Sequence, residues 1–219
     1  MTFDDRLRRV FESLTERLEA DVRRQVQAAM DEAPAAQPTA ETDASTTRRL
    51  LDSVQALGRA RSLSAMLDTL ASAAAREASR ASVLTLREGR AHGWRFIGFG
   101  ALDQTPPVDL RLDDTGIIAN AARANAVASE EPVPAFAELG QPASCLALPI
   151  ALGGEVVAVL YADDGSRRLD AQTPTSEPRV LNAEALEIVA RFAACGIEAI
   201  TAFKVARSIA ATPSLETTR

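Results

Sequence analysis

The sequence holds few of the residues that most often carry catalysis or bind metals. Among its 219 residues are two cysteines, Cys145 and Cys195, and one histidine, His92. The two cysteines stand far apart and match no metal-ligand spacing, and a single histidine excludes a histidine-rich metal centre. A glycine-rich loop that would cradle phosphate is also missing. We therefore expect no metal site and no catalytic constellation.

Long apolar runs and excess positive charge are missing too. No apolar run approaches the roughly 18–20 residues that cross a membrane, and the charged N-terminus lacks the apolar core of a signal peptide. Lys and Arg number 24 against 30 Asp and Glu, for a net charge of −6, which does not attract nucleic acid or anionic lipid. We expect a cytoplasmic protein, with reduced cysteines, that binds neither nucleic acid nor membrane. Lys204 is the only lysine, a bias that indicates a GC-rich bacterial genome.

Periodicity and composition divide the chain into four segments. Residues 1–31 carry one apolar stripe at steps of three and four, which predicts an amphipathic helix. Such a helix needs a partner: a second copy in a coiled coil, its own domain, or another protein. Residues 32–46 are rich in proline, alanine and small polar residues and predict a flexible linker. Residues 47–207 predict the folded domain, and residues 208–219 a disordered tail.

The folded domain alternates between helical and strand periodicity. Apolar stripes predict helices in TTRRLLDSVQALGRA and SLSAMLDTLASAAAREAS. The period then changes to two, which predicts strands in ASVLTLREG and WRFIGFGAL. A short strand follows in TPPVDLRL, then a helix in DDTGIIANAARANAVA with Asp113 or Asp114 as its N-cap. A hairpin and a last helix capped by Asn182 complete the order.

The hairpin CLALPIALGGEVVAVLYADDG turns at Gly153-Gly154, because glycine accepts the positive φ of the tightest turns. A two-residue turn at this point places Leu148 opposite Val159 and fixes the register. The bulky residues of both strands then share one face, and the small residues that alternate from Cys145 share the other. This small face suits close approach either by the alanine-rich last helix or by a ligand.

Two residue types in this region restrict its structure further. Pro149 has no amide proton, so it must lie at an edge, a bulge or a loop. Cys145 belongs to the hairpin and Cys195 to the last helix, which puts them on opposite sides of the sheet. Because a resolving pair needs Cα atoms within roughly 7 Å, we interpret both as buried structural cysteines.

Three stretches are similar to one family. ASCLALPIALGGEVVAVLYADD resembles the signature hairpin of GAF domains, and LLDSVQALGRARSLSAMLDTLASAAARE resembles their first helices. TGIIANAARANAVASEEPVPAF resembles the helix and short strand beside their pocket. The resemblance covers residues 50–207. It implies an α+β fold, with an antiparallel sheet of five to six strands and helices on both faces, here preceded by a separate N-terminal helix.

The family resemblance also bears on ligands and cofactors. It implies sensing or dimerisation, with a pocket on the sheet face opposite the first and last helices. The Asn-Lys-x-Phe stretch of cyclic-nucleotide-binding members is missing, and no cysteine stands in a bilin-attachment context. His92, beside a turn glycine, is a poor candidate for haem. The cofactor, if any, stays unknown.

The candidate ligand site lies between the sheet and residues 117–136. Two strand residues would share a face by period two and form its floor, and one helix residue would supply an orienting polar contact. Apolar pockets with a few polar groups are the usual kind, although the same residues also fit a filled core. The six candidates are Trp94, Phe96, Ile117, Asn120, Ala121 and Phe136.

These features predict a non-enzymatic module that relays a small-molecule or partner signal by protein–protein contact. We expect a homodimer formed through the N-terminal and last helices. Two alternatives stay open. One is a small redox enzyme of the free methionine-sulfoxide reductase type that uses Cys145. The other is a GAF-like scaffold without a pocket.

Overall fold

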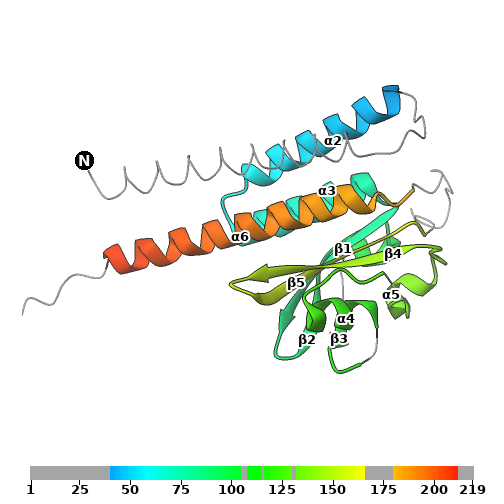
Figure 1. Cartoon of the computed structure of the whole chain (residues 1–219). Coiled ribbons are helices and arrows are strands. Elements are labelled where there is room, and N and C mark those ends of the chain that lie inside the picture. Colours follow the sequence, from blue (N-terminus) through cyan, green and yellow to red (C-terminus); the bar gives the residue numbers. More distant parts are fainter. Residues whose placement is uncertain (1–39, 105–107, 115, 130–131, 166–179, 212–219) are drawn as a thin grey trace, which may run out of the picture. The chain divides into compact units, whose positions relative to one another are not determined.

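The computed structural model describes residues 40–104, 108–114, 116–129, 132–165 and 180–211 (Figure 1). The helix predicted for residues 1–31 lies outside these described residues. The chain divides into two compact units, residues 1–51 and 52–219. Helix α2, Ala40–Gly58, begins in the first unit and ends in the second. Residues 40–46 are therefore helical, where composition predicted a linker.

The second unit is built around one antiparallel sheet of five strands in the order β3-β2-β1-β5-β4. This confirms the predicted α+β fold and the pairing of its two hairpins. A short 3₁₀ turn, η1, Gly100–Asp103, follows the second strand. The strands are β1 Arg80–Arg87, β2 Arg90–Ile97, β3 Asp109–Arg111, β4 Cys145–Leu152 and β5 Glu155–Asp163.

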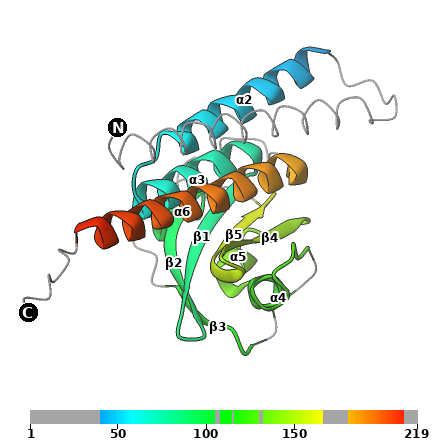
Figure 2. The same ribbon diagram turned by 60° about the vertical axis from the view of Figure 1, so that its left-hand side comes forward.

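Helices cover both faces of this sheet (Figures 1 and 2). Helix α3, Leu63–Glu77, and helix α6, Ala183–Ala211, pack side by side on one face. Helices α4, Ile117–Ala124, and α5, Ala135–Glu138, lie over the other face. Helix α6 is 29 residues long and ends at Ala211, so residues 208–211, which were predicted to belong to a disordered tail, are helical. The helix continues past the edge of the sheet (Figure 1).

The sequence predicted N-cap residues for two of these helices, and the structure confirms one of them. The Oδ1 of Asn182 accepts a hydrogen bond from the Ala185 amide at 3.2 Å, which confirms it as the cap of α6. Helix α4 instead begins after Gly116, so Asp113 and Asp114 are not its N-cap. The described helices include none that is both long and apolar enough to cross a membrane.

The β4–β5 hairpin turns at Gly153 and Gly154, with φ of +60° and +87°, as predicted. Beyond the turn the predicted register is wrong, because the pairing shifts by one residue after Ala151↔Val156. Leu148 therefore pairs with Leu160, and Ala147 with Tyr161. An extra residue in one strand reverses the alternation beyond it.

The shift changes which side chains share a face. Leu146, Leu148 and Ile150 now share their face with Ala158, Leu160 and Ala162. Because α6 contacts β4 on this face, it packs on leucines and not on the predicted face of small residues. Pro149 lies on β4, an edge strand of the sheet, where its missing amide proton leaves no ladder bond unmade.

Candidate functional site

A row of four residues crosses the sheet on the face opposite α3 and α6. Phe96 pairs with Ser82, Ser82 with Tyr161, and Tyr161 with Ala147. Since residues in register on adjacent strands share a face, these side chains stand next to one another. All four are buried. A large ring therefore stands on each side of the small Ser82 side chain, which leaves a dent between them.

Four aromatic rings pack together on this face: Phe96 and Tyr161 of the row, with Phe99 and Phe136 against them. The ring of Phe136, from α5, lies 5.1 Å from that of Phe96 and 5.4 Å from that of Tyr161, both edge to face. Phe99 lies 5.4 Å from Phe96 and 5.6 Å from Phe136. Such T-shaped pairs add about 0.5–1.5 kcal/mol beyond the area they bury. The dent over Ser82 is thus filled by a side chain of the same chain.

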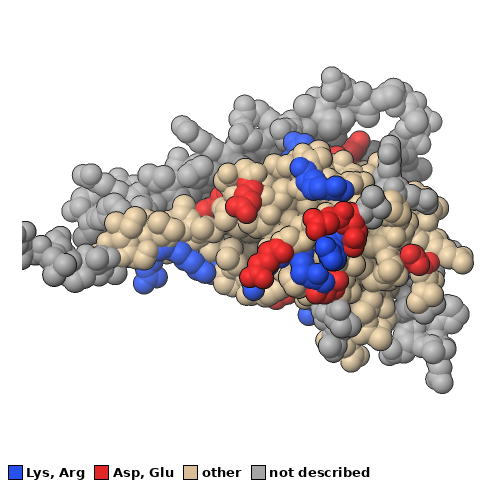
Figure 3. Space-filling model, turned by 90° about the horizontal axis from the view of Figure 1, so that it is seen from below, with Lys and Arg blue, Asp and Glu red and all other residues tan. Residues whose placement is uncertain are grey.

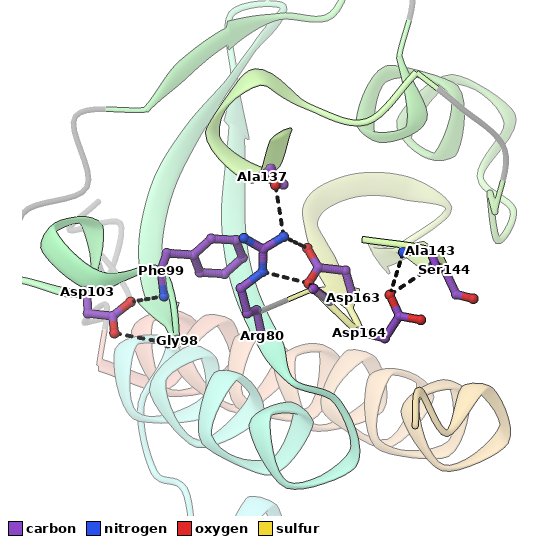
Figure 4. A network of polar contacts seen from close by, with 10 residues as sticks. Arg80, Gly98, Phe99, Asp103, Ala137, Ala143, Ser144, Asp163 and Asp164 are labelled. Carbon is purple, nitrogen blue, oxygen red and sulfur yellow. Dashed lines mark hydrogen bonds and ion pairs between the residues drawn. The ribbon is translucent and has the colours of Figure 1, made fainter. Parts of the chain in front are cut away.

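A buried ion pair lies beside this row, two residues along β1 from Ser82 and two along β5 from Tyr161, and Figure 4 shows it from close by. Arg80 Nε donates to Asp163 Oδ1 and its Nη2 to Oδ2, both at 2.7 Å. The side chains of Arg80 and Asp163 are 2% and 0% exposed. Nη2 also donates to the Ala137 carbonyl at 2.9 Å, and the guanidinium lies 4.7 Å from the centre of the Phe99 ring. A buried charge in this position is tolerated because it is paired and hydrogen-bonded.

Glycine makes room for this arginine. A Cβ added at Gly140 or at Gly165 would overlap the Arg80 guanidinium. The Gly165 amide also donates to Asp163 Oδ1 at 3.0 Å. These contacts fasten three distant stretches of chain together: the start of β1, the end of α5 and the end of β5.

Two further carboxylates fix the loops around the pair (Figure 4). Asp103 accepts from the Gly98 and Phe99 amides, each at 2.9 Å, and so holds Phe99 against Arg80. Asp164 accepts from the amides of Ala143 and Ser144 at 2.8 and 2.9 Å. Each of these carboxylates satisfies two backbone donors that a loop would otherwise leave to water.

The same corner of the sheet meets the helices of the opposite face. The Ser79 amide donates to the Asp163 carbonyl at 3.0 Å, and the Asn182 amide to the Glu77 carbonyl at 2.9 Å. The Asn182 side chain also donates to Glu77 Oε2 at 3.3 Å. Glu77 ends α3 and Asn182 caps α6. The ion pair is therefore joined, through a few residues, to the adjoining ends of both helices.

A hollow of about 290 Å³ opens between β3, the start of α4 and the segment that contains α5. Its volume is at the lower end of the range for small-molecule pockets, roughly 300–1,000 Å³. The walls are mainly aliphatic, with one basic and two acidic residues. The lining residues are Leu110, Arg111, Leu112, Asp114, Gly116, Ile117, Ile118, Ala119, Pro132, Val133, Pro134, Ala135 and Glu138.

Four of the six predicted site residues come together. Phe96, Ile117 and Ala121 are 1%, 0% and 0% exposed and belong to one apolar cluster, against which the partly buried Phe136 packs. Their packing is that of a filled core. Of the six, Ile117 alone also lines the hollow.

The other two predicted residues lie elsewhere. Trp94 stands at a bulge where the pairing shifts between Val83↔Arg95 and Leu84↔Gly93. Its Nε1 donates to Asp68 of α3 at 3.1 Å, so the prediction that it shares a face with Phe96 is wrong. Asn120 is exposed, and its Oδ1 accepts from Arg123 at 3.0 Å, which removes it from the floor of any pocket.

The sequence prediction missed the polar residues of this site. Arg80 and Asp163 lie at the ends of apolar strands, where a charged residue normally indicates that the chain reaches solvent. Ser82 and Tyr161 stand within those strands. A signal was present in RASVLTL and VAVLYADD, where one strand opens on a base and the other closes on an acid. Only the antiparallel pairing of β1 with β5 brings the two together.

The hydroxyls of the row differ from the charged groups beside them. Within the described residues the buried Ser82 Oγ makes no hydrogen bond, and the buried Tyr161 hydroxyl, which makes no hydrogen bond of strict geometry, has the Asp163 carboxylate as its polar neighbour. Burial, together with the neighbouring Asp163 carboxylate, raises the pKa of Tyr161 well above its ordinary 10.0. Tyr161 therefore stays neutral and able to donate.

The two cysteines have different environments. Cys145 is buried and belongs to the cluster with Tyr161. Cys195 is exposed on α6, so its interpretation as a buried cysteine is wrong. Partial burial nevertheless raises the pKa of its thiol, and the nearby Glu198 adds to this. The sheet lies between the two thiols, as predicted.

Basic and acidic side chains lie interspersed on the face that Figure 3 shows. On β2 and β3, Arg90 donates to Asp109 at 2.7 Å, and His92 lies 3.5 Å from the same carboxylate. The hydrogen bond from Arg90 lowers the pKa of Asp109 and raises that of Arg90. Exposed pairs of this kind contribute little to stability, so we assign them no part in the site.

The fold and its two helix-covered faces agree with the comparison to known families. The family model of the GAF domain matches residues 49–197. The chain belongs to the GAF domain family. Its GAF domain is the folded unit that carries the ion pair, the aromatic cluster and the hollow. No curated protein matches the chain.

Solved GAF structures share this fold at low sequence identity. The GAF domain of a phosphoenolpyruvate-protein phosphotransferase from Acinetobacter is 17% identical, with a TM-score of 0.51 over 74% of this chain and 96% of its own. Its counterpart from Coxiella burnetii is also 17% identical, with a TM-score of 0.51 over 76% and 96%. Residues 122 to 287 of a methyl-accepting chemotaxis protein, 17% identical, give 0.54 over 69% and 98%. At this identity the likeness concerns the fold alone.

Proposed function

We propose that this chain is a non-enzymatic sensory and dimerisation module of a cytoplasmic bacterial signalling protein. GAF domains are in general regulatory modules, and the hollow between β3, α4 and α5 is the observation that carries the proposal. The hollow touches α5 through Ala135 and Glu138. Between them lies Ala137, whose carbonyl accepts from Arg80. A small molecule in the hollow would therefore be connected, through Ala137 and the Arg80–Asp163 ion pair, to the ends of α3 and α6.

The net charge of the lining limits which molecules would bind. The lining holds one base, Arg111, and two acids, Asp114 and Glu138, among aliphatic residues. A strongly anionic ligand would meet a net negative rim, so a small, largely apolar, neutral or cationic molecule fits better. We expect binding to come mainly from apolar burial, with a few polar contacts that fix orientation.

Helix α6 supports the proposed homodimer. Its last turns expose Phe203, Val205 and Ile209, at 39%, 52% and 70%. Cys195, Ala199, Ala202, Ala206 and Ile209 also recur at steps of four and three. This is the spacing of a coiled-coil seam. Small residues along such a seam let two copies of the helix approach closely, so we propose that α6 pairs with α6 of a second chain.

The sensory part of the proposal is tested by thermal denaturation of the full chain against a metabolite library. A ligand of the hollow raises the melting temperature by mass action. Ala135→Trp fills the hollow from an exposed position and should abolish the rise, whereas Ala124→Trp, exposed outside the lining, should preserve it. A library that shifts neither protein would favour the scaffold alternative.

Light scattering at micromolar concentration tests the dimer. The full chain should give twice its mass of 23.3 kDa. Ala202→Arg with Ala206→Arg should yield monomer, because charge is placed in the seam, while Ser208→Arg on another face of α6 should stay dimeric. A wild-type monomer would refute this part. Methionine-sulfoxide reduction that is lost in Cys145→Ser would refute the non-enzymatic part.

A further inference from the structure

The dent over Ser82 is filled by a ring that comes from outside the sheet. Phe96 and Tyr161 stand on either side of Ser82 on the floor. The ring of Phe136 lies within 5.1 and 5.4 Å of theirs, so it spans the space above the serine. A floor that is large at both sides and small in the middle accommodates one flat ring.

The floor beneath this ring holds polar groups that a hydrocarbon ring cannot satisfy. The Ser82 Oγ is fully buried and makes no hydrogen bond within the described residues, and the buried Tyr161 hydroxyl has near it the Asp163 carboxylate, which Arg80 already pairs. Leaving a buried hydroxyl without a partner costs about 1–3 kcal/mol. The unpartnered Ser82 Oγ, between two rings on the floor, therefore marks a place where a polar atom belongs.

Phe136 is also the outermost of the four rings and is held by a short strap, residues 132–140. Phe96, Phe99 and Tyr161 are 1%, 6% and 0% exposed, whereas Phe136 is only partly buried. The strap is fixed behind Phe136 by the bond from Arg80 to Ala137. Ahead of it, the Pro132 carbonyl accepts from the Ile117 amide at a longer 3.3 Å.

The strap separates the dent from the hollow. Four strap residues on the near side of Phe136, together with Glu138, line the hollow, while Phe136 itself packs on the rings beneath. Ile117 borders both spaces, since it lines the hollow and also belongs to the apolar cluster that contains the rings. A side-chain rotation of Phe136, or a small lift of residues 132–136, would join the two spaces.

We propose that the Phe136 ring occupies the binding site of a small aromatic ligand with a hydrogen-bonding substituent, which binds by displacing that ring. The aromatic class follows from the walls, which are three rings, and from the guanidinium of Arg80 against Phe99. The substituent follows from the unpartnered Ser82 Oγ and the buried Tyr161 hydroxyl on the floor. The proposal rests on the proposed sensory function and specifies its ligand.

Phenol and toluene are the probes, because they have nearly the same shape and differ in the hydroxyl. Binding is measured by titration calorimetry on the full chain for wild type, Phe136→Ala, and Phe136→Ala combined with Ser82→Ala or Tyr161→Phe. Removing the competing ring should tighten phenol binding by about tenfold or more, since the free protein no longer has to expel it. Phenol should bind Phe136→Ala more tightly than toluene.

The hydroxyl variants separate a polar site from a mere void. Ser82→Ala and Tyr161→Phe should each reduce the preference for phenol over toluene and leave toluene affinity unchanged. An engineered apolar cavity also binds small aromatics, so equal binding of both probes to Phe136→Ala would overturn the proposal. So would an unchanged phenol affinity on removal of the ring.

Two measurements keep the test decisive if Phe136→Ala does not fold. Phe136→Leu removes the ring with a smaller loss of volume, and phenol should still bind it more tightly than wild type. In the wild type, phenol should shift the methyl resonances of Ala121 and Ala147 in NMR spectra. A library compound that binds the hollow, is blocked by Ala135→Trp and leaves those methyls unmoved would sustain the proposed function and refute the displacement of Phe136.

Discussion

Arg80 and Asp163 form a two-pronged ion pair in which neither side chain is more than 2% exposed. Removing one partner of such a pair leaves an uncompensated charge in the interior. We expect Arg80→Met to lower the free energy of unfolding by about 3–5 kcal/mol, measured by urea denaturation.

Two control variants test whether that loss of stability comes from the buried ion pair. Arg80→Met with Asp163→Leu should recover much of the loss, because well-packed apolar residues often replace a buried pair at little cost. Asp109→Asn breaks the exposed pair with Arg90 and should change the stability little. Equal losses from the buried and exposed pairs would contradict the assigned role of Arg80.

The glycine beside Arg80 gives a second prediction. Because a Cβ at Gly140 would overlap the guanidinium, Gly140→Ala should destabilise the domain by roughly 1–3 kcal/mol, as overpacking does. Gly58→Ala is the matched control, since its Cβ would meet Phe192 at an ordinary 3.9 Å. In an Arg80→Met background the Gly140→Ala loss should shrink. A loss that persists there would point to the backbone of Gly140 and away from the packing.

The elements of the domain could largely be predicted, because they depend on local patterns. The glycine turn at Gly153 and the cap at Asn182 follow from the conformations those residues prefer. The faces of two strands could not be predicted. Between Glu155 and Asp163 of EVVAVLYAD all side chains are apolar or nearly so, so alternation does not reveal the residue that the bulge adds near Val157.

The same limit applies to the candidate site. Phe96, Ile117 and Phe136 were predicted because large apolar residues near a pocket-forming segment gather in its core. Trp94 was misplaced because one bulge reverses the alternation between it and Phe96. The Arg80–Asp163 pair depends on contacts between residues 83 positions apart, which no local pattern encodes.

Tyr161 is the only tyrosine, so its ionisation can be followed by tyrosinate absorbance. Burial first, and then the Asp163 carboxylate, raise its pKa above 10.0. The folded protein should show no tyrosinate while unfolded chain, in urea, titrates near pH 10. The folded state then holds a proton that the unfolded state has lost, so stability should fall as the pH rises above about 10. A reversible tyrosinate signal near pH 10 without unfolding would disprove this burial.

Cys145 and Cys195 should react at very different rates with a thiol reagent. Cys195 is exposed and Cys145 buried, so one thiol should be labelled in the native protein and the second only on unfolding. Because the pKa of Cys195 is raised, its labelling rate should keep increasing above pH 9 as the thiolate forms. Cys195→Ser should remove the fast phase and Cys145→Ser should not. Fast labelling in Cys195→Ser would mean that the Cys145 side of the sheet opens readily.

Trp94, the only tryptophan, reports on the sheet face that α3 and α6 cover, because its indole donates to Asp68 of α3. Asp68→Ala frees the indole and should move its emission to longer wavelength, with a loss in stability of about 0.5–1.5 kcal/mol, the usual net value of one hydrogen bond. Thr69→Ala, on the next residue of α3, is the control and should leave the emission unchanged. A ligand on the opposite face should not alter the emission maximum of the wild type. If a ligand that Ala135→Trp blocks still shifts the emission, the signal must cross the sheet to α3, and Arg80→Met should then abolish the shift while binding persists.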